Sequence, residues 1–307
     1  MSTKQKINLP SGDFSSTSEE KKTSLLFLTS DLINSLKRIP LAHFPLVKEI
    51  SLDLGISRCV VHFIAPDKFI INGQLILLPE NLFFEDESRS IFIYENNSWK
   101  KWHIFDERTN KFYKMIYVAP AKPPTIEISG IKMHITQNSD PAQDTSCKIK
   151  SFKYLRGLVL DTCTGLGYTA IASAQNSAVI RVYTCENNIN VHRLSRQNPW
   201  SQSLFSNPKI KPMLISVDQL VTFVPSKFFD SIIHDPPRYR LATELYSPSF
   251  YQNLYRILKK GGELYHYTGD PQRRIRRIPL AVDTQHQLKE IGFRTVKLSY
   301  NGVIAKK

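Results

Sequence analysis

The second half of the chain alternates between short β-branched segments and segments whose apolar residues recur at helical spacing. This pattern predicts helices over 168–175 and 247–260. Strands are predicted at 157–163, 179–186, 211–216, 229–235 and 262–268. Such alternation is typical of an α/β fold, a parallel sheet with helices on both faces. After a last helix over 283–293, two strands are joined by the tight turn Asn301-Gly302, so one strand at that edge must run antiparallel.

The first half has a different pattern. Residues 1–22 are polar and are predicted to be a disordered tail, and Ser24–Ile39 is predicted to be an amphipathic helix. Short β-branched and aromatic runs with turn signals predict a small, mostly antiparallel β-domain. Taking residues 119–124 as a linker, we divide the chain into a tail, a β-rich domain, a connecting segment near the active site and an α/β domain. These cover residues 1–22, 23–124, 125–150 and 151–307.

Positive charge is concentrated in the second half. The formal net charge is +14; residues 1–150 hold 19 Lys and Arg against 17 Asp and Glu, whereas residues 151–307 hold 22 against 10. Such a field attracts a polyanion such as RNA, or an anionic small molecule. The alternative is that a basic composition only reflects solubility.

Other sequence features bear on location and metal binding. No apolar run is long enough to span a membrane, and the first residues lack the apolar segment of a secretory signal. The four cysteines lie far apart without a C-x-x-C pair, which disfavours a zinc site and a disulfide framework. We therefore expect a cytoplasmic protein with no metal; the oligomeric state does not follow from the sequence.

A glycine-rich loop follows the first strand of the second half, in the segment DTCTGLGYTA. Gly165 and Gly167 allow a sharp turn and a close approach of the backbone to a ligand, at the N-terminus of the next helix. Glu186 ends the second strand, where an acid can accept hydrogen bonds from ribose hydroxyls. These features alone fit either a nicotinamide cofactor or S-adenosylmethionine.

Three acids follow three of the strands. Asp161 precedes Gly165 by four positions, Asp218 follows the third strand, and Asp235 opens the motif Asp-Pro-Pro-Arg after the fourth. Ligands bind at this carboxyl edge in open α/β sheets. Each acid alone is equally consistent with a helix cap or a turn, but the set favours a site for S-adenosylmethionine.

Together these motifs resemble those of class I S-adenosylmethionine-dependent methyltransferases. The Lys-Lys-Gly-Gly turn before the fifth strand and the terminal hairpin fit the same superfamily. More narrowly, DTCTGLGYTA, NPWS, IIHDPPR and YHYTG, with EISGIKMH upstream, resemble a group of predicted methyltransferases best represented in archaea. The resemblance runs from about Ser51 to the C-terminus and implies a Rossmann-like sheet with an antiparallel last strand. It also implies S-adenosylmethionine as cofactor, with cofactor-binding residues Asp161, Thr162, Gly165, Gly167, Glu186 and Asp218.

The resemblance also suggests how an acceptor is held. In amino-directed methyltransferases a similar Asp-Pro-Pro-aromatic element accepts hydrogen bonds from the target amine, and the prolines stiffen the loop. It implies Asp235, Pro236 and Pro237 as the catalytic element, with Asp235 positioning the amine and accepting a proton. Arg238 departs from the pattern because it stands where the family has the aromatic residue; it either stacks on a base or binds an anion.

Further substrate contacts are expected along the same edge. His234 is predicted to point into the core, away from Asp235, and Trp200 to anchor its loop. His134 and Asp140, in the connecting segment, either line the site or belong to a plain connector. The expected substrate-binding residues are Arg238, Tyr239, His266, Tyr267 and the arginines Arg273, Arg274, Arg276 and Arg277 of the loop after the fifth strand, which is a candidate phosphate site.

We therefore predict a methyltransferase that acts on RNA or another anionic substrate, and the Asp-Pro-Pro motif favours a nitrogen atom as the methyl acceptor. Two alternatives stay open: an aminopropyl or aminocarboxypropyl transferase on the same fold, and a non-catalytic RNA-binding module that has kept the fold. A nicotinamide oxidoreductase is the least favoured reading, because the terminal hairpin is not expected of that family.

Overall fold

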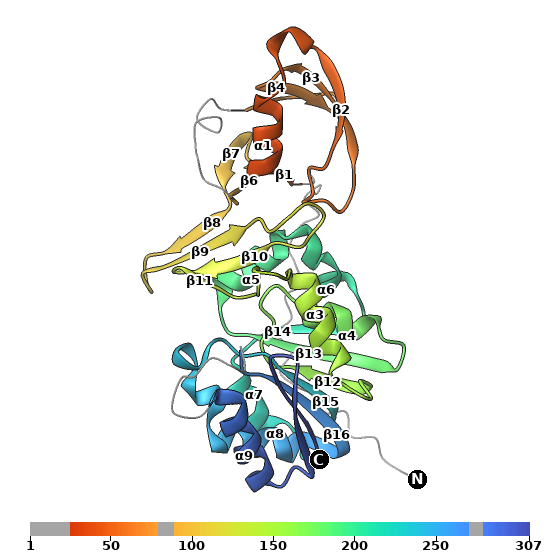
Figure 1. Cartoon of the computed structure of the whole chain (residues 1–307), viewed down its shortest axis with the longest axis vertical. Coiled ribbons are helices and arrows are strands. Elements are labelled where there is room, and N and C mark those ends of the chain that lie inside the picture. The colour runs from red at the N-terminus through yellow and green to blue at the C-terminus, as the bar shows by residue number, and fades with distance from the viewer. Residues whose placement is uncertain (1–24, 79–88, 270–278) are drawn as a thin grey trace.

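The computed structural model describes residues 25–78, 89–269 and 279–307. In this part of the chain a seven-stranded mixed sheet lies at one end of the molecule and smaller antiparallel sheets at the other (Figure 1). The order of the large sheet is β14-β13-β12-β15-β16-β18-β17. Its strands are β12 (Gly157–Asp161), β13 (Val179–Glu186), β14 (Ile210–Leu214), β15 (Phe229–His234), β16 (Leu258–Tyr267), β17 (Thr295–Ser299) and β18 (Gly302–Lys306).

The pairings in this sheet confirm the predicted α/β fold. From β14 to β16 every pair is parallel, whereas β18 runs antiparallel to both of its neighbours, β16 and β17. The terminal hairpin pairs Ser299 with Gly302, and Asn301 takes a positive φ of 44° in its turn. The antiparallel strand is therefore inserted between β16 and the edge strand β17.

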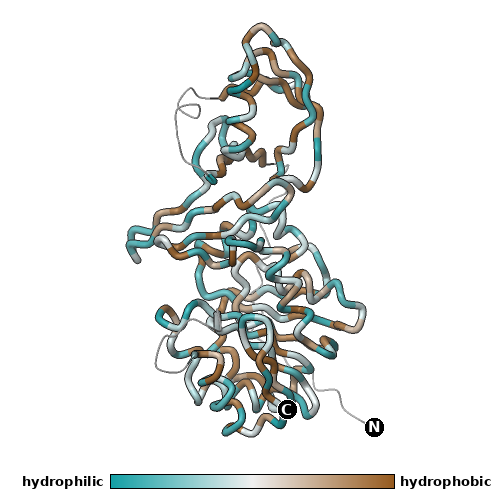
Figure 2. Tube along the Cα trace, viewed as in Figure 1, coloured by the Kyte–Doolittle hydropathy of each residue, from teal (hydrophilic) through white to brown (hydrophobic). Residues whose placement is uncertain are grey.

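Helices cover both faces of the sheet. One face packs on α7 (Val217–Phe223), α8 (Pro248–Ile257) and α9 (Leu280–Ile291) in the largest hydrophobic cluster. The opposite face packs on α4 (Tyr168–Gln175) and α6 (Gln202–Ser206), with Phe152 and Ile149 at the end of α3 (Pro141–Lys150). Apolar residues alternate with polar ones along these elements (Figure 2). The remaining elements of this half are α5 (Ile189–Gln197) and the 3-10 helices η2 (Pro199–Ser201), η3 (Tyr239–Leu241) and η4 (Thr243–Tyr246).

The N-terminal part is built from antiparallel pairs, as the sequence predicts. Its sheets have the orders β1-β6-β7, β2-β3-β4-β5 and β11-β10-β9-β8. The strands are β1 (Leu26–Thr29), β2 (Leu46–Ile50), β3 (Cys59–Ala65), β4 (Lys68–Ile71), β5 (Gln74–Leu77), β6 (Ile91–Glu95), β7 (Ser98–Lys101), β8 (His103–Asp106), β9 (Lys111–Ile116), β10 (Thr125–Ile128) and β11 (Ile131–Lys132), and the helices are α1 (Ser30–Lys37) and η1 (Leu41–His43).

Two predictions about this half need correction. The predicted helix 24–39 begins as strand β1, which pairs with β6, and only then becomes α1, whose N-cap Thr29 accepts a hydrogen bond from Leu32. The predicted linker 119–124 has no regular structure, yet β10 after it pairs with β9 before it. A sheet therefore crosses the predicted boundary, because the apolar start of β10 completes the edge that β9 would otherwise expose.

The two halves share a hydrophobic core next to the glycine loop. Trp102, Tyr113 and Met115 pack in one cluster with Leu166 of that loop and with Tyr168 at the start of α4. The Tyr168 hydroxyl donates to the Pro124 carbonyl at 2.9 Å. The N-terminal part is thus fastened to the region where the sequence predicts cofactor binding. Within the described residues, no helix is long and apolar enough to cross a membrane.

Candidate active site

The predicted site lies between β12 and β15, where the order in which the chain adds strands to the sheet reverses. The strands β12 and β15 are parallel neighbours, and the connections that follow them lead to opposite sides of the sheet. Asp161 ends β12, opposite Ile233, and Asp235 comes just after the end of β15. The structure therefore brings the glycine loop and the Asp-Pro-Pro motif together at a topological switch point, where such sheets bind ligands.

The glycine loop needs both of its glycines, for different reasons. Gly165 and Gly167 have φ angles of +53° and +81°. A Cβ at Gly165 would point into open space, whereas one at Gly167 would lie 2.6 Å from Leu204 Cδ2. Gly165 thus leaves room for a ligand above the loop, and Gly167 allows the start of α4 to pack against α6.

Glu186 is fixed at the rim of this open space. Its Oε2 accepts from the Gly165 N–H and its Oε1 from the Asn188 N–H, both at 2.9 Å. Asn188 also donates from its side chain to the Tyr113 hydroxyl at 2.8 Å, which connects this rim to the N-terminal part. Burial raises the pKa of Glu186 to about 7, against the effect of these backbone donors. A fixed acceptor beside open space suits a ligand that carries hydroxyl groups.

Asp161 and Thr162 lie beneath the loop. Asp161 is fully buried, and its two oxygens accept from the hydroxyls of Thr169 at 3.1 Å and Thr184 at 2.6 Å. Burial raises the pKa of Asp161 to about 7. Thr162 is also buried, and its hydroxyl is 2.7 Å from His234 Nδ1. These contacts support the loop from inside, and direct cofactor contact by either residue stays a prediction.

Asp218 lies in the first turn of α7, just beyond β14, and is exposed. Its carboxylate accepts a hydrogen bond from the Ser216 hydroxyl. This turn is at the carboxyl end of a parallel strand, on the side of β13 away from β12. The cofactor contact of Asp218 that the sequence resemblance implies stays a prediction.

Asp235 is held by a buried lysine that the sequence analysis missed. Lys148 of α3 is 2% exposed, and its Nζ lies 2.6 Å from Asp235 Oδ2 and 2.8 Å from Asp144 Oδ2. The Tyr300 hydroxyl donates to Asp144 Oδ1 at 3.0 Å, and the Tyr267 ring centroid is 4.4 Å from the ammonium. We call Lys148, Asp144, Asp235, Tyr267 and Tyr300 the lysine cluster.

The charged groups of the lysine cluster shift one another's pKa values. Burial raises the pKa of Asp235, and the neighbouring Lys148 ammonium opposes that rise. Burial alone lowers the pKa of Lys148, but Asp235 and Asp144 outweigh it and the net shift is upward. The ammonium therefore stays charged between its two carboxylates. One sequence signal was present: Asp140-Pro141 is a helix start, which places Asp144 and Lys148 one turn apart on the same helix face.

The rest of the Asp-Pro-Pro-Arg motif forms a rigid rim. Pro236 is buried, and the Pro237 carbonyl accepts from the Tyr246 hydroxyl at 2.8 Å. Arg238 is exposed, and the half-buried Tyr239 packs edge-on against Tyr246 at 5.3 Å between ring centroids. Arg238 is thus available to a substrate.

Among the other predicted contacts, His266 needs correction. It is fully buried, with Nε2 at 2.8 Å from the Tyr251 hydroxyl and its ring 4.3 Å from that of His234. Strand alternation turns it into the core, while Tyr267 faces the lysine cluster. His234 is buried as predicted. The remaining candidates, Arg273, Arg274, Arg276 and Arg277, lie outside the described residues.

The connecting segment and the Trp200 loop behave as structural supports. Asp140 is the N-cap of α3 and pairs with Lys122 at 2.9 Å. His134 packs its ring on Tyr168 at 5.3 Å, and burial lowers its pKa to about 4. Trp200 donates from Nε1 to the Leu54 carbonyl at 3.1 Å, which confirms the anchoring role.

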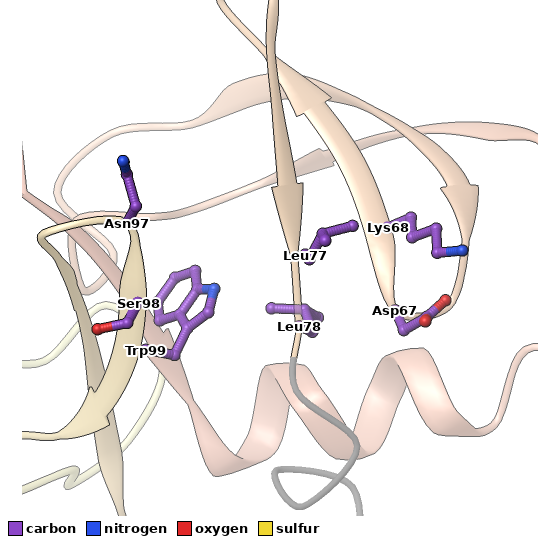
Figure 3. A pocket seen from close by; sticks show the side chains of 7 residues that line it. All are labelled: Asp67, Lys68, Leu77, Leu78, Asn97, Ser98 and Trp99. Carbon is purple, nitrogen blue, oxygen red and sulfur yellow. The ribbon is translucent and has the colours of Figure 1, made fainter.

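A separate cavity of about 410 Å³ lies in the N-terminal part (Figure 3). The side chains that line it come from the β4–β5 hairpin, β7 and the turns beside them, and Trp99 forms one wall. No residue of the lysine cluster or the glycine loop lines it. It is therefore distinct from the candidate active site.

Comparisons with known proteins place the chain in a family. No family model matches its sequence. The chain is 41% identical over 214 residues to the uncharacterized protein MJ1233 of Methanocaldococcus jannaschii. The aligned residues cover 69% of this chain and 71% of that protein. The chain belongs to the MJ1233 family. The sequence resemblance to an archaeal group is confirmed to that extent.

The fold of this MJ1233 family member is similar to that of solved spermidine synthases. It is similar to a spermidine synthase in complex with the transition state analogue AdoDATO, with a TM-score of 0.53, 17% identity and coverage of 69% of this chain and 76% of that one. It is also similar to the spermidine synthase of Thermotoga maritima, with a TM-score of 0.50, 16% identity and coverage of 68% and 73%. At such identities the likeness concerns the fold alone.

Proposed function

We propose that this chain is an S-adenosylmethionine-dependent methyltransferase that modifies a nitrogen atom presented to Asp235. The observation that carries the proposal is the place of Asp235. It stands at the switch point beside the open glycine loop, its side chain is 20% exposed, and Lys148 holds one of its oxygens. The other oxygen, Oδ1, has no hydrogen-bond partner among the described residues and is left for an acceptor.

The residues at the loop fit S-adenosylmethionine. Gly165 leaves open space where a side chain would otherwise project, and Glu186 is fixed beside that space to accept bonds from ribose hydroxyls. The lysine cluster holds one ammonium and two carboxylates, so it leaves a net negative charge near the switch point. A positively charged sulfonium would be stabilised by that charge.

The chain's own residues would act mainly by positioning. Bound S-adenosylmethionine supplies an electrophilic methyl group on a positively charged sulfur. Oδ1 of Asp235 accepts a hydrogen bond from the acceptor N–H and so directs the nitrogen lone pair toward that methyl carbon. Asp235 would then take up the proton that the nitrogen loses as it gains the methyl group. The Tyr246 hydroxyl, bound to the Pro237 carbonyl, holds the loop still during this step.

RNA or another anionic substrate suits the surroundings of the site. Arg238 and Arg240, three and five positions after Asp235, are both exposed. The excess of basic residues between 151 and 307 acts in the same direction. The sequence adds four more positive charges after β16, at Arg273, Arg274, Arg276 and Arg277.

The second candidate function is aminopropyl or aminocarboxypropyl transfer, which the fold of the spermidine synthases supports. The lysine cluster counts against a polyamine as acceptor. Asp144 and Asp235 are the carboxylates that would bind a cationic amine, and the ammonium of Lys148 is already bound to both. A non-catalytic RNA-binding module is the remaining alternative, and it does not explain why the glycine loop keeps its open space.

Calorimetric titration of the purified protein tests these functions. The ligands are S-adenosylmethionine, S-adenosylhomocysteine, decarboxylated S-adenosylmethionine and NAD. We expect binding of the first two only, and a search for methyl acceptors among RNAs would follow. Preference for the decarboxylated compound would support aminopropyl transfer, and binding of none of them would support the non-catalytic module.

A further inference from the structure

A charged lysine inside a protein is costly unless its partners are well placed. Lys148 meets that condition, with Asp235 and Asp144 at 2.6 and 2.8 Å from its Nζ. Replacing a buried ion pair by apolar side chains is often neutral or stabilising, so packing alone does not explain a lysine at this position. What distinguishes Lys148 is its contact with Asp235, the carboxylate that the proposed function places against the methyl acceptor.

Segments distant in sequence fix the geometry. Asp144 and Lys148 are one turn apart on α3, and Asp235 follows β15. Tyr300 reaches Asp144 from the turn of the terminal hairpin, and Ser299 beside it donates to the Ser151 hydroxyl at 2.8 Å. The start of the catalytic domain and its last hairpin are thereby tied together next to Asp235, so the ammonium has little freedom to move.

We propose that Lys148 is a positioning residue: its ammonium fixes Oδ2 of Asp235 and keeps this carboxylate ionised, so that Oδ1 alone is presented to the acceptor. The part of this inference that concerns the acceptor rests on the proposed function. Asp144 is the second anchor of the ammonium, and Tyr300 holds Asp144 in place. The effect of Lys148 on the charge of Asp235 depends on neither cofactor nor acceptor.

Several groups bear on the charge of Asp235. Burial raises its pKa, Lys148 lowers it and Asp144 raises it. Removing the ammonium should therefore raise the pKa of Asp235, and removing the charge of Asp144 should lower it. The titratable and charged groups around Asp235 are Lys148, Asp144, Asp161, Cys163, Tyr246, Tyr265 and Tyr267, with Arg238 at the exposed end.

The experiment is a titration of the full chain labelled with ¹³C at aspartate Cγ. The Asp235 signal is identified as the one missing from Asp235→Asn. In Lys148→Met we expect its titration midpoint to move up by about 1–3 pH units relative to the unmodified protein, the usual size of the effect of an adjacent opposite charge. In Asp144→Asn we expect the midpoint to move down, because a like charge is lost and Lys148 keeps Asp235 as its ionic partner.

Lys259→Met is the matched control, because Lys259 pairs with Asp230 at 2.7 Å near the surface of the same domain. It should leave the Asp235 midpoint unchanged. An unchanged midpoint in Lys148→Met would overturn the proposal. If that variant does not fold, Asp144→Asn decides: a downward shift supports the proposal and the absence of one overturns it.

A kinetic measurement separates this inference from the proposed function. If methyl transfer is found, Lys148→Met should shift the acidic limb of the pH–rate profile upward and recover activity at high pH. A loss of rate that is equal at every pH would indicate a structural role and overturn the proposal. If the midpoints shift as expected but no S-adenosylmethionine binds, the charge effect of Lys148 stands and the proposed function fails.

Discussion

The loops after β12 and β15 lie side by side, and each begins with an aspartate at the end of a buried strand. The first is shaped by glycines and neutral hydroxyls: Asp161 is fully buried and accepts from Thr169 and Thr184. The second is shaped by prolines and charge: Asp235 is partly exposed and paired with Lys148. The glycine loop leaves space for a ligand. The proline loop, residues 235–238, places a carboxylate oxygen beside that space, where it can accept a hydrogen bond.

The difference shows that the same residue in equivalent strand positions takes its role from its partners. Hydroxyl donors satisfy Asp161 while burial raises its pKa to about 7. Burial raises the pKa of Asp235 as well, but there the adjacent ammonium of Lys148 opposes the rise and favours the ionised form. We therefore propose that Asp161 supports the structure of its loop and that Asp235 takes part in the chemistry, and each role has its own test.

The largest effect is expected from Asp235→Asn. The amide keeps the shape of the side chain but accepts no proton, so transfer should fall by about a hundredfold or more. Affinity for S-adenosylmethionine, measured by calorimetry, should stay within a few-fold. Asp230→Asn, in the surface pair with Lys259, is the control and should retain transfer. Loss of cofactor binding in Asp235→Asn would mean that Asp235 contacts the cofactor and that the methyl acceptor binds elsewhere.

Both glycines have a positive φ, so a side chain at either position should cost stability, and a side chain at Gly165 should in addition block the ligand. Gly165→Val places a side chain in the open space, so cofactor affinity should fall roughly tenfold or more, about 1.4 kcal/mol. Gly167→Ala collides with Leu204 and should lower the free energy of unfolding by about 1–3 kcal/mol. Calorimetric titration and urea unfolding of both variants give the comparison. Equal cofactor affinity in Gly165→Val and the unmodified chain would exclude this loop as the binding site.

Asp161 should contribute a pH dependence to stability. Its pKa rises from 3.8 to about 7 on folding, so the folded state binds more protons in this range and stability falls as pH rises through it. From pH 5 to pH 8 the loss from this group is about 2–3 kcal/mol. Asp161→Asn should remove that part of the slope in urea unfolding measured at several pH values. Glu186 is unchanged in both proteins, so the difference between them isolates Asp161.

The sequence predicts the large sheet well because each strand there is a short apolar segment with local turn signals at its ends. The predicted helix 168–175 has the same bounds as α4, and the antiparallel terminal strand follows from Asn301-Gly302. Strand β1 was misread as helix because Leu26, Phe27 and Leu28 also fit a helical face. Only pairing with β6, more than sixty positions away, decides between the two.

Candidate site residues can be proposed from the sequence where they belong to a local motif, but not where they depend on tertiary packing. The glycine loop, Glu186 and Asp235 follow from strand ends and spacing. Lys148 and Tyr300 are brought to Asp235 from other segments by tertiary contacts, and no local pattern links the three. His266 shows the converse: its place at a strand end is correct, but the pleat directs its side chain into the core.

The smallest expected effect is on the salt dependence of RNA binding, because the two loops differ in positive charge. The segment from Asp161 to Ala170 holds no lysine or arginine, whereas the proline loop continues into the exposed Arg238. If Arg238 contacts a phosphate of the acceptor, Arg238→Ala should weaken RNA binding uniformly across sequences and reduce the salt slope by about one. Fluorescence titration with an RNA at several salt concentrations measures this slope. Lys227→Ala, beyond the opposite end of β15, is the control and should leave it unchanged. A lower affinity with an unchanged slope would instead favour stacking of the guanidinium on a base, so the two roles left open for Arg238 are distinguished.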